Sequence, residues 1–145
     1  MTRALLFLHV TSIAVWLGSL VTLYLLSRRA LSPASPEALA VVYETTRTVV
    51  RRVINPSALA VLLTGIAMMV QLGMVGKQKV FWLAFMEQFG GMVALICVAL
   101  LTWQVRKLER ASPDERVARL RSLGRTFLGV GAGVAATIFV VTLRL

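Results

Sequence analysis

The sequence predicts an all-α, polytopic membrane protein: one antiparallel bundle of four transmembrane helices that occupies residues 1–145. First, the chain is 58% hydrophobic and its mean hydropathy is +0.81, whereas soluble domains are about 45–50% apolar. Second, the apolar residues fall into four runs near the length of about 20 residues that crosses a hydrocarbon core. Third, the Lys and Arg residues cluster between these runs, as in membrane proteins. This clustering argues against a nucleic-acid partner and makes the lipid bilayer the expected one.

The first run, residues 4–26, contains the only histidine of the chain and ends at Ser27-Arg28-Arg29. A helix places residues at offsets of 0, 3, 4, 7 and 11 on one face. We therefore predict that the bundle buries a face made of His9, Ser12, Ile13, Trp16 and Leu20. The run is too long for the core of a signal peptide, so we expect a retained anchor.

Between the first two runs the sequence predicts a cytoplasmic amphipathic helix. Ser35-Pro36-Glu37 is typical of a helix start, with Ser as cap, Pro in the first turn and Glu at the positive end of the dipole. Asn55-Pro56 is expected to end this helix and to cap a new one. That new helix is the second span, residues 56–75.

The second hairpin repeats this plan. A short turn at Gly76–Lys79 leads into the third span, residues 80–105. Ser112-Pro113-Asp114-Glu115 then predicts the start of a short, Arg-rich helix through a capping box. The fourth span is residues 127–145, in which Gly129 and Gly133 allow close helix packing, within the bundle or in a homodimer.

The distribution of charge predicts the orientation. Twelve of the 16 Lys and Arg residues lie in segments 28–55 and 106–126. The positive-inside rule places these segments in the cytoplasm. Both termini are then expected on the outer side.

Two ionisable residues lie within the predicted spans, and such residues usually mark functional sites. His9 and Glu87 are about 8 and 10 Å from the outer ends of their spans at a rise of 1.5 Å per residue. Further polar and thioether side chains fall in the same zone: Gln71, Gln88, Met68, Met69, Met74 and Met86. We therefore expect a polar, thioether-rich pocket in the outer half of the bundle.

Three interpretations of this pocket stay open. In the first, a b-type haem takes His9 as axial ligand and Met86 as the second, beside Trp16 and Glu87. Small residues would make room for the ring: Gly18, Gly65, Gly90 and Gly91. In the second, Cu(I) is bound by imidazole and thioethers, which soft copper favours: His9, Met68, Met69 and Met86. In the third, His9 makes a structural hydrogen bond to Glu87 or Gln71, and the methionines fill the core.

Three stretches resemble the CopD-like and HemJ-like bacterial membrane proteins. His9 followed by Ala14-Val15-Trp16-Leu17-Gly18-Ser19-Leu20 is similar to the first helix of that family. Pro56 and Leu63-Thr64-Gly65-Ile66-Ala67-Met68 resemble the second helix. The stretch from Ala94-Leu95 to Trp103-Gln104-Val105-Arg106 resembles the end of the third.

This resemblance implies a four-helix unit in the bacterial plasma membrane. HemJ-type members oxidise protoporphyrinogen with the first-helix His and a third-helix Lys, and CopD-type members are linked to copper uptake. His9 matches the family His, but Met86 and Glu87 stand where the Lys is expected. This departure argues against HemJ-type oxidation and leaves haem binding open. If the chain is an enzyme, it is an oxidoreductase.

The expected function is therefore haem b binding in electron transfer or haem handling. Copper handling of CopD type is the first alternative. The second is a non-catalytic subunit of a larger membrane complex that docks through the fourth span and the basic loops.

Overall fold

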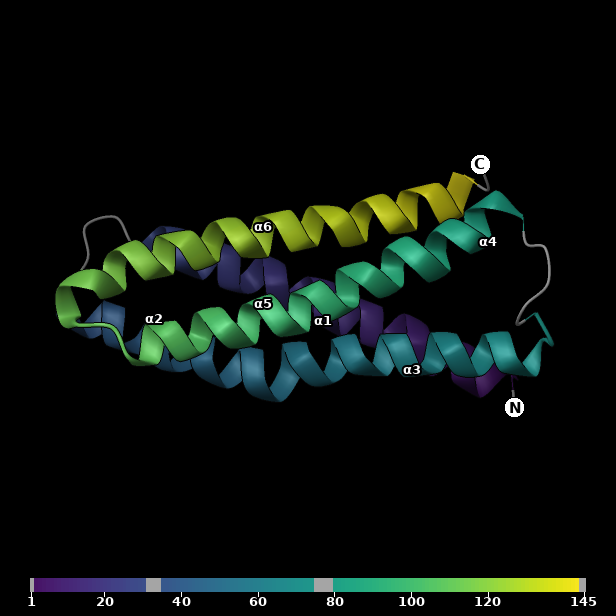
Figure 1. The fold of residues 1–145 in the computed structure, drawn as a ribbon. Helices are drawn as coiled ribbons and strands as arrows, with labels where there is room; N and C mark the ends of the chain where they lie inside the picture. The colour runs from purple at the N-terminus through teal and green to yellow at the C-terminus, as the bar shows by residue number, and fades with distance from the viewer. Residues whose placement is uncertain (1, 31–34, 75–79, 144–145) are drawn as a thin grey trace.

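Four long helical rods form an antiparallel bundle in a computed structural model that describes residues 2–30, 35–74 and 80–143 (Figure 1). No strand occurs within these residues, and the predicted all-α class is confirmed. The first rod is α1 (Thr2–Ala30). The second consists of α2 (Pro36–Val49), η1 (Val50–Ile54) and α3 (Asn55–Gln71), and the third of α4 (Phe81–Phe85), η2 (Met86–Gly90) and α5 (Gly91–Glu109). The fourth is α6 (Pro113–Leu143). The segments η1 and η2 are π-helical turns inside their rods.

All four rods are long and apolar enough to cross a membrane, with candidate spans of 27 to 36 residues. Large apolar side chains point away from the bundle, including Phe7 (69% exposed), Leu63 (65%) and Phe139 (63%). Exposing so much apolar surface to water would cost free energy, whereas exposing it to lipid does not. This chain is therefore a multi-pass membrane protein.

The second rod corrects the prediction that Asn55-Pro56 ends one helix and caps another. Asn55 has helical backbone angles (φ −63°, ψ −47°), and its N–H donates to the carbonyl of Val50, five residues back. A proline in an α-helix clashes with the carbonyl four residues earlier and lacks an N–H donor. The extra residue in the π turn accommodates this conflict, so α2 continues into α3.

The fourth rod corrects a second boundary, because the Arg-rich helix after Ser112 and the predicted span 127–145 form the single helix α6. No proline interrupts residues 114–143. The internal Gly124 costs only about 1 kcal/mol relative to Ala. At the start of α2 the prediction is confirmed: the Ser35 side chain accepts a hydrogen bond from the Ala38 N–H (3.1 Å).

The core lies between four rods arranged in a ring. Helix α1 packs against α3 and α6, and α5 packs against the same two helices from the other side. Trp16, Leu20 and Cys97 are at most 2% exposed, together with Leu101 and Phe127. The side chain of Cys97 is therefore part of the packed core.

The two ends of the bundle differ in charge. Both described ends of the chain lie at one end, with the C-terminus of α3 and the start of α4, as expected for an even number of antiparallel rods (Figure 1). The arginine-rich ends of the rods lie at the opposite, basic end. The predicted turn at Gly76–Lys79 and residues 144–145 lie outside the described residues.

At the basic end one carboxylate joins two rods. Glu109 of α5 forms ion pairs with Arg47 (2.7 Å) and with Arg51 (2.9 Å) of the second rod. The Glu109 side chain is 24% exposed, so solvent screens these two contacts only in part.

We expect Glu109→Gln to lower the free energy of unfolding by about 1 kcal/mol, because two guanidinium groups lose a shared carboxylate. Glu44→Gln is the matched control, since Glu44 is 61% exposed and 3.9 Å from Arg47. Unfolding in mild detergent would measure both variants. Equal stability of the two would contradict the role of Glu109.

Candidate functional site

The buried face of α1 is the one predicted from the sequence. His9 is 9% exposed, Trp16 2% and Leu20 1%. Leu23 and Ser27 continue the same stripe toward the basic end. The only imidazole of the chain thus lies on the core-facing side of α1, about 10 Å along the helix from Thr2 at 1.5 Å per residue.

A hydrogen bond fixes the proton on the imidazole of His9. Nδ1 lies 2.9 Å from Oγ1 of Thr64 in α3. The single hydroxyl proton of Thr64 is donated to the carbonyl of Ala60 (2.6 Å). With its proton donated there, Thr64 accepts from Nδ1–H of His9, and a lone pair is left on Nε2. This arrangement is typical of histidines that bind metals, which donate their other N–H to a neighbouring group.

Gly65 of α3 leaves room for the imidazole ring of His9. A Cβ built at Gly65 would lie 3.4 Å from Cε1 of His9. That distance is tighter than most van der Waals contacts of a Cβ, and any larger side chain would push the ring away. The Thr64-Gly65 pair thus supplies both the acceptor and the space for His9.

The structure divides the predicted methionines into two groups. Met68 and Met69 lie on α3 just beyond Thr64, where Met69 is 5% exposed and Met68 is half-buried. Met86 lies on η2, which packs against α5 and α6. Met74 is exposed at the end of the second rod. Of the predicted methionines, only Met68 and Met69 therefore lie on α3, the helix whose Thr64 is hydrogen-bonded to His9.

The predicted partners of His9 are replaced by one that the sequence analysis missed. Glu87 and Gln71, the two partners expected from the sequence, are exposed, and the hydrogen bond of His9 goes to Thr64 instead. A threonine inside an apolar run was the available signal. Threonine tolerates burial in a helix because its hydroxyl bonds back to the preceding turn, and the same oxygen can still accept from a neighbouring helix.

Trp16 belongs to the packed core. Its ring is 2% exposed, and its indole N–H has no acceptor among the described residues. The side chain of Cys97 lies beside this N–H without completing a hydrogen bond of good geometry. The face that was predicted to stack on a flat ligand is therefore covered by protein in this structure.

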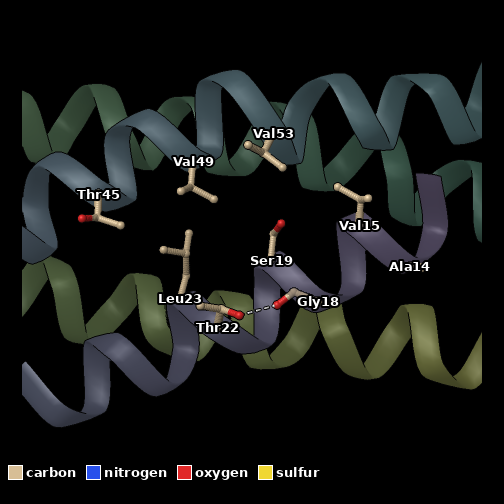
Figure 2. A pocket seen from close by; sticks show the side chains of 9 residues that line it. All are labelled: Ala14, Val15, Gly18, Ser19, Thr22, Leu23, Thr45, Val49 and Val53. Atoms are coloured by element: carbon tan, nitrogen blue, oxygen red, sulfur yellow. Dashed lines mark hydrogen bonds between the residues drawn. The ribbon is translucent and has the colours of Figure 1, made fainter. Parts of the chain in front are cut away.

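The glycines that were predicted to admit a haem have close neighbours. Positions for a Cβ lie 3.3 Å from Thr137 at Gly90 and 3.6 Å from Leu62 at Gly91. Gly18 alone of the four faces open space. It lines a mostly apolar groove of about 360 Å³ between α1 and the α2–η1 segment, nine residues along α1 from His9 (Figure 2). The open space at these glycines is therefore the groove at Gly18, away from His9 along α1.

Comparison of the chain with models of protein families, with curated proteins and with solved structures found no match. The resemblance to CopD-like and HemJ-like proteins stays a prediction. The argument for function rests on the geometry around His9.

We expect His9 in the purified protein to be the neutral tautomer with its proton on Nδ1. Because His9 is the only histidine, nitrogen NMR of histidine-labelled protein reports this ring alone. Thr64→Val removes the acceptor, and a mixture of tautomers is the expected result. A spectrum that Thr64→Val leaves unchanged would show that the hydrogen bond does not set the tautomer.

We also expect Gly65→Val to displace the imidazole and change the same spectrum, because the new side chain meets the ring. Gly18→Val is the control, since nothing lies within 4 Å of a Cβ at that position. A wild-type spectrum from Gly65→Val would contradict the close approach.

Proposed function

We propose that this protein is a copper-handling membrane protein in which Nε2 of His9 is a ligand for Cu(I). The hydrogen bond from Nδ1–H to Thr64 (2.9 Å) carries this proposal, because it leaves the Nε2 lone pair ready for a metal. A fixed N–H donor also orients the ring and raises the basicity of the ligating nitrogen. The metal would be held in the half of the bundle that contains both termini.

The neighbouring thioethers support copper over other metals. Met68 follows Thr64 by four residues and so lies on the same face of α3, about 6 Å along the axis. Met69 is next to it and is buried. Imidazole and thioethers are neutral, soft ligands that select Cu(I). No cluster of three or more His, Cys, Asp or Glu side chains exists among the described residues to favour a harder ion.

The orientation is part of the proposal. We propose that the protein lies in the plasma membrane of a bacterium with its basic end in the cytoplasm. Twelve of 16 Lys and Arg residues support this through the positive-inside rule. His9 then lies in the outer half of the membrane, where copper arriving from outside would reach it first.

A bare ion fits these residues better than a haem does. The same Nε2 could ligate haem iron, but a Cβ built at Gly65, Gly90 or Gly91 would lie 3.3 to 3.6 Å from a side chain, that of His9, Thr137 or Leu62 respectively. A macrocycle would require the helices to separate at these contacts. Haem binding stays a prediction, and the experiment below tests it on the same sample.

The test is an anaerobic titration of the detergent-purified protein with Cu(I) against a competing chelator. We expect one Cu(I) per chain, and at least tenfold weaker binding for His9→Ala and for Met68→Leu. Thr64→Val should weaken binding about 10- to 100-fold, the usual effect of removing a partner of a ligating histidine. Met92→Leu is the matched control, because Met92 is 50% exposed on α5, and it should bind as the wild type does.

Oxidised and reduced absorption spectra of the same material complete the experiment. Soret and α bands that vanish in His9→Ala would show that His9 is a ligand of haem iron instead of copper. Equal Cu(I) binding by wild type and His9→Ala would overturn the copper proposal. If neither ligand binds and another membrane protein copurifies, the subunit interpretation replaces both.

A further inference from the structure

A second pocket lies at the opposite end of the bundle from His9, between α1 and α6. Its volume is about 200 Å³. Helix α1 contributes Tyr24, Ser27 and Arg28 to the lining, and α6 contributes Arg121, Gly124 and Arg125. Three arginines therefore contribute to the lining of one small space at the boundary between an apolar span and the basic end.

Arginines outside the pocket lie close to three of the described acidic side chains near this end. Glu109 binds Arg47 and Arg51, Glu44 approaches Arg47, and Glu115 approaches Arg119. No described carboxylate forms an ion pair with Arg28, Arg121 or Arg125. Three like charges around one pocket repel each other, so an anion from outside the chain would stabilise this arrangement.

Close packing of the two helices brings the arginines together. A Cβ built at Gly124 would lie 3.6 Å from the Cβ of Ser27, so α6 approaches α1 closely at this point. Arg121 lies three residues before Gly124, Arg125 follows Gly124 directly, and Arg28 follows Ser27 directly. The pocket is thus a consequence of the α1–α6 contact.

The pocket contains a further donor. Arg28 Nη1 lies 3.5 Å from the hydroxyl oxygen of Tyr24, and the guanidinium lies 6.0 Å from the ring centroid. When Arg28 donates to Tyr24, the phenolic proton stays available to an anion. Guanidinium groups bind phosphate oxygens in bidentate fashion, so this set of donors suits a phosphate ester.

The apolar residues at the rim of the pocket favour a lipid over a soluble anion as its ligand. Leu128 completes the lining and is 54% exposed. Leu25 and Val21 of α1 are also exposed, at 53% and 48%. A molecule with its phosphate among the arginines would therefore have apolar surface of the bundle directly beside it, where acyl chains can lie.

We propose that this pocket binds the headgroup phosphate of an anionic phospholipid from the membrane leaflet at the basic end. Basic pockets between transmembrane helices are known sites for such headgroups. The lipid bridges α1 and α6 through Arg28 on one side and Arg121 and Arg125 on the other. This site is independent of His9 and of copper.

Native mass spectrometry of the detergent-purified protein, titrated with phosphatidylglycerol, tests the proposal. We expect one tightly bound lipid per chain, and at least tenfold weaker binding when Arg28, Arg121 and Arg125 are all changed to Gln. The control changes three exposed cations of the same end that lie outside the pocket, Arg52, Arg106 and Arg110, to Gln. It removes the same charge and should retain the tight site.

Further titrations identify the source of the phosphate. Phosphatidylcholine should bind at least tenfold more weakly than phosphatidylglycerol, and millimolar inorganic phosphate should not displace the bound lipid. Circular dichroism of both triple variants checks that each is folded. If the two triple variants lose lipid binding equally, general surface charge and not the pocket holds the lipid, and the proposal is overturned. Displacement by inorganic phosphate would overturn the assignment to lipid.

Discussion

The structure depends on one constraint: a helix in lipid must satisfy its backbone hydrogen bonds within itself. The second rod shows the result most clearly. Pro56 would break a helix in water, yet here the backbone inserts a π turn at Val50–Ile54 and continues. The third rod contains a similar turn at Met86–Gly90. Both deviations lie within rods that are otherwise regular, so the bundle keeps four continuous helices.

The same constraint governs the side chains. Besides the ion pairs of Glu109, three polar pairs connect the described rods, and each of them uses a threonine: His9 with Thr64, Asn55 with Thr102, and Gln104 with Thr126. Thr64 and Thr126 also donate to carbonyls of their own helices, so each hydroxyl connects two structural elements. These bonds hold neighbouring helices in register where apolar contacts alone are unspecific. Placing His9 in this network fixes which of its nitrogens is left for a ligand.

The bundle thus has two chemically different ends. Near the termini, His9 and the thioethers of α3 offer neutral, soft ligands with no cluster of charge among the described residues. At the opposite end, guanidinium groups surround the rods, and Glu109 neutralises only two of them. The two proposed ligands, Cu(I) and a lipid phosphate, belong to these two different environments. The apolar middle, with Trp16 and Cys97 at its centre, separates them.

The sequence by itself determined the fold class, the four spans and the buried face of α1, because run length and helical periodicity are local properties. It also singled out His9, since an imidazole in an apolar run is unusual. Only the tertiary structure decided the partner of His9, because Thr64 is 55 residues away and any of several polar side chains could have met the ring. It also decided that α2 and α3 form one rod. A helix continues through a proline only where the neighbouring turn widens enough to avoid the clash. The arginine pocket likewise arises from the close approach of Gly124 to Ser27, which no local pattern specifies.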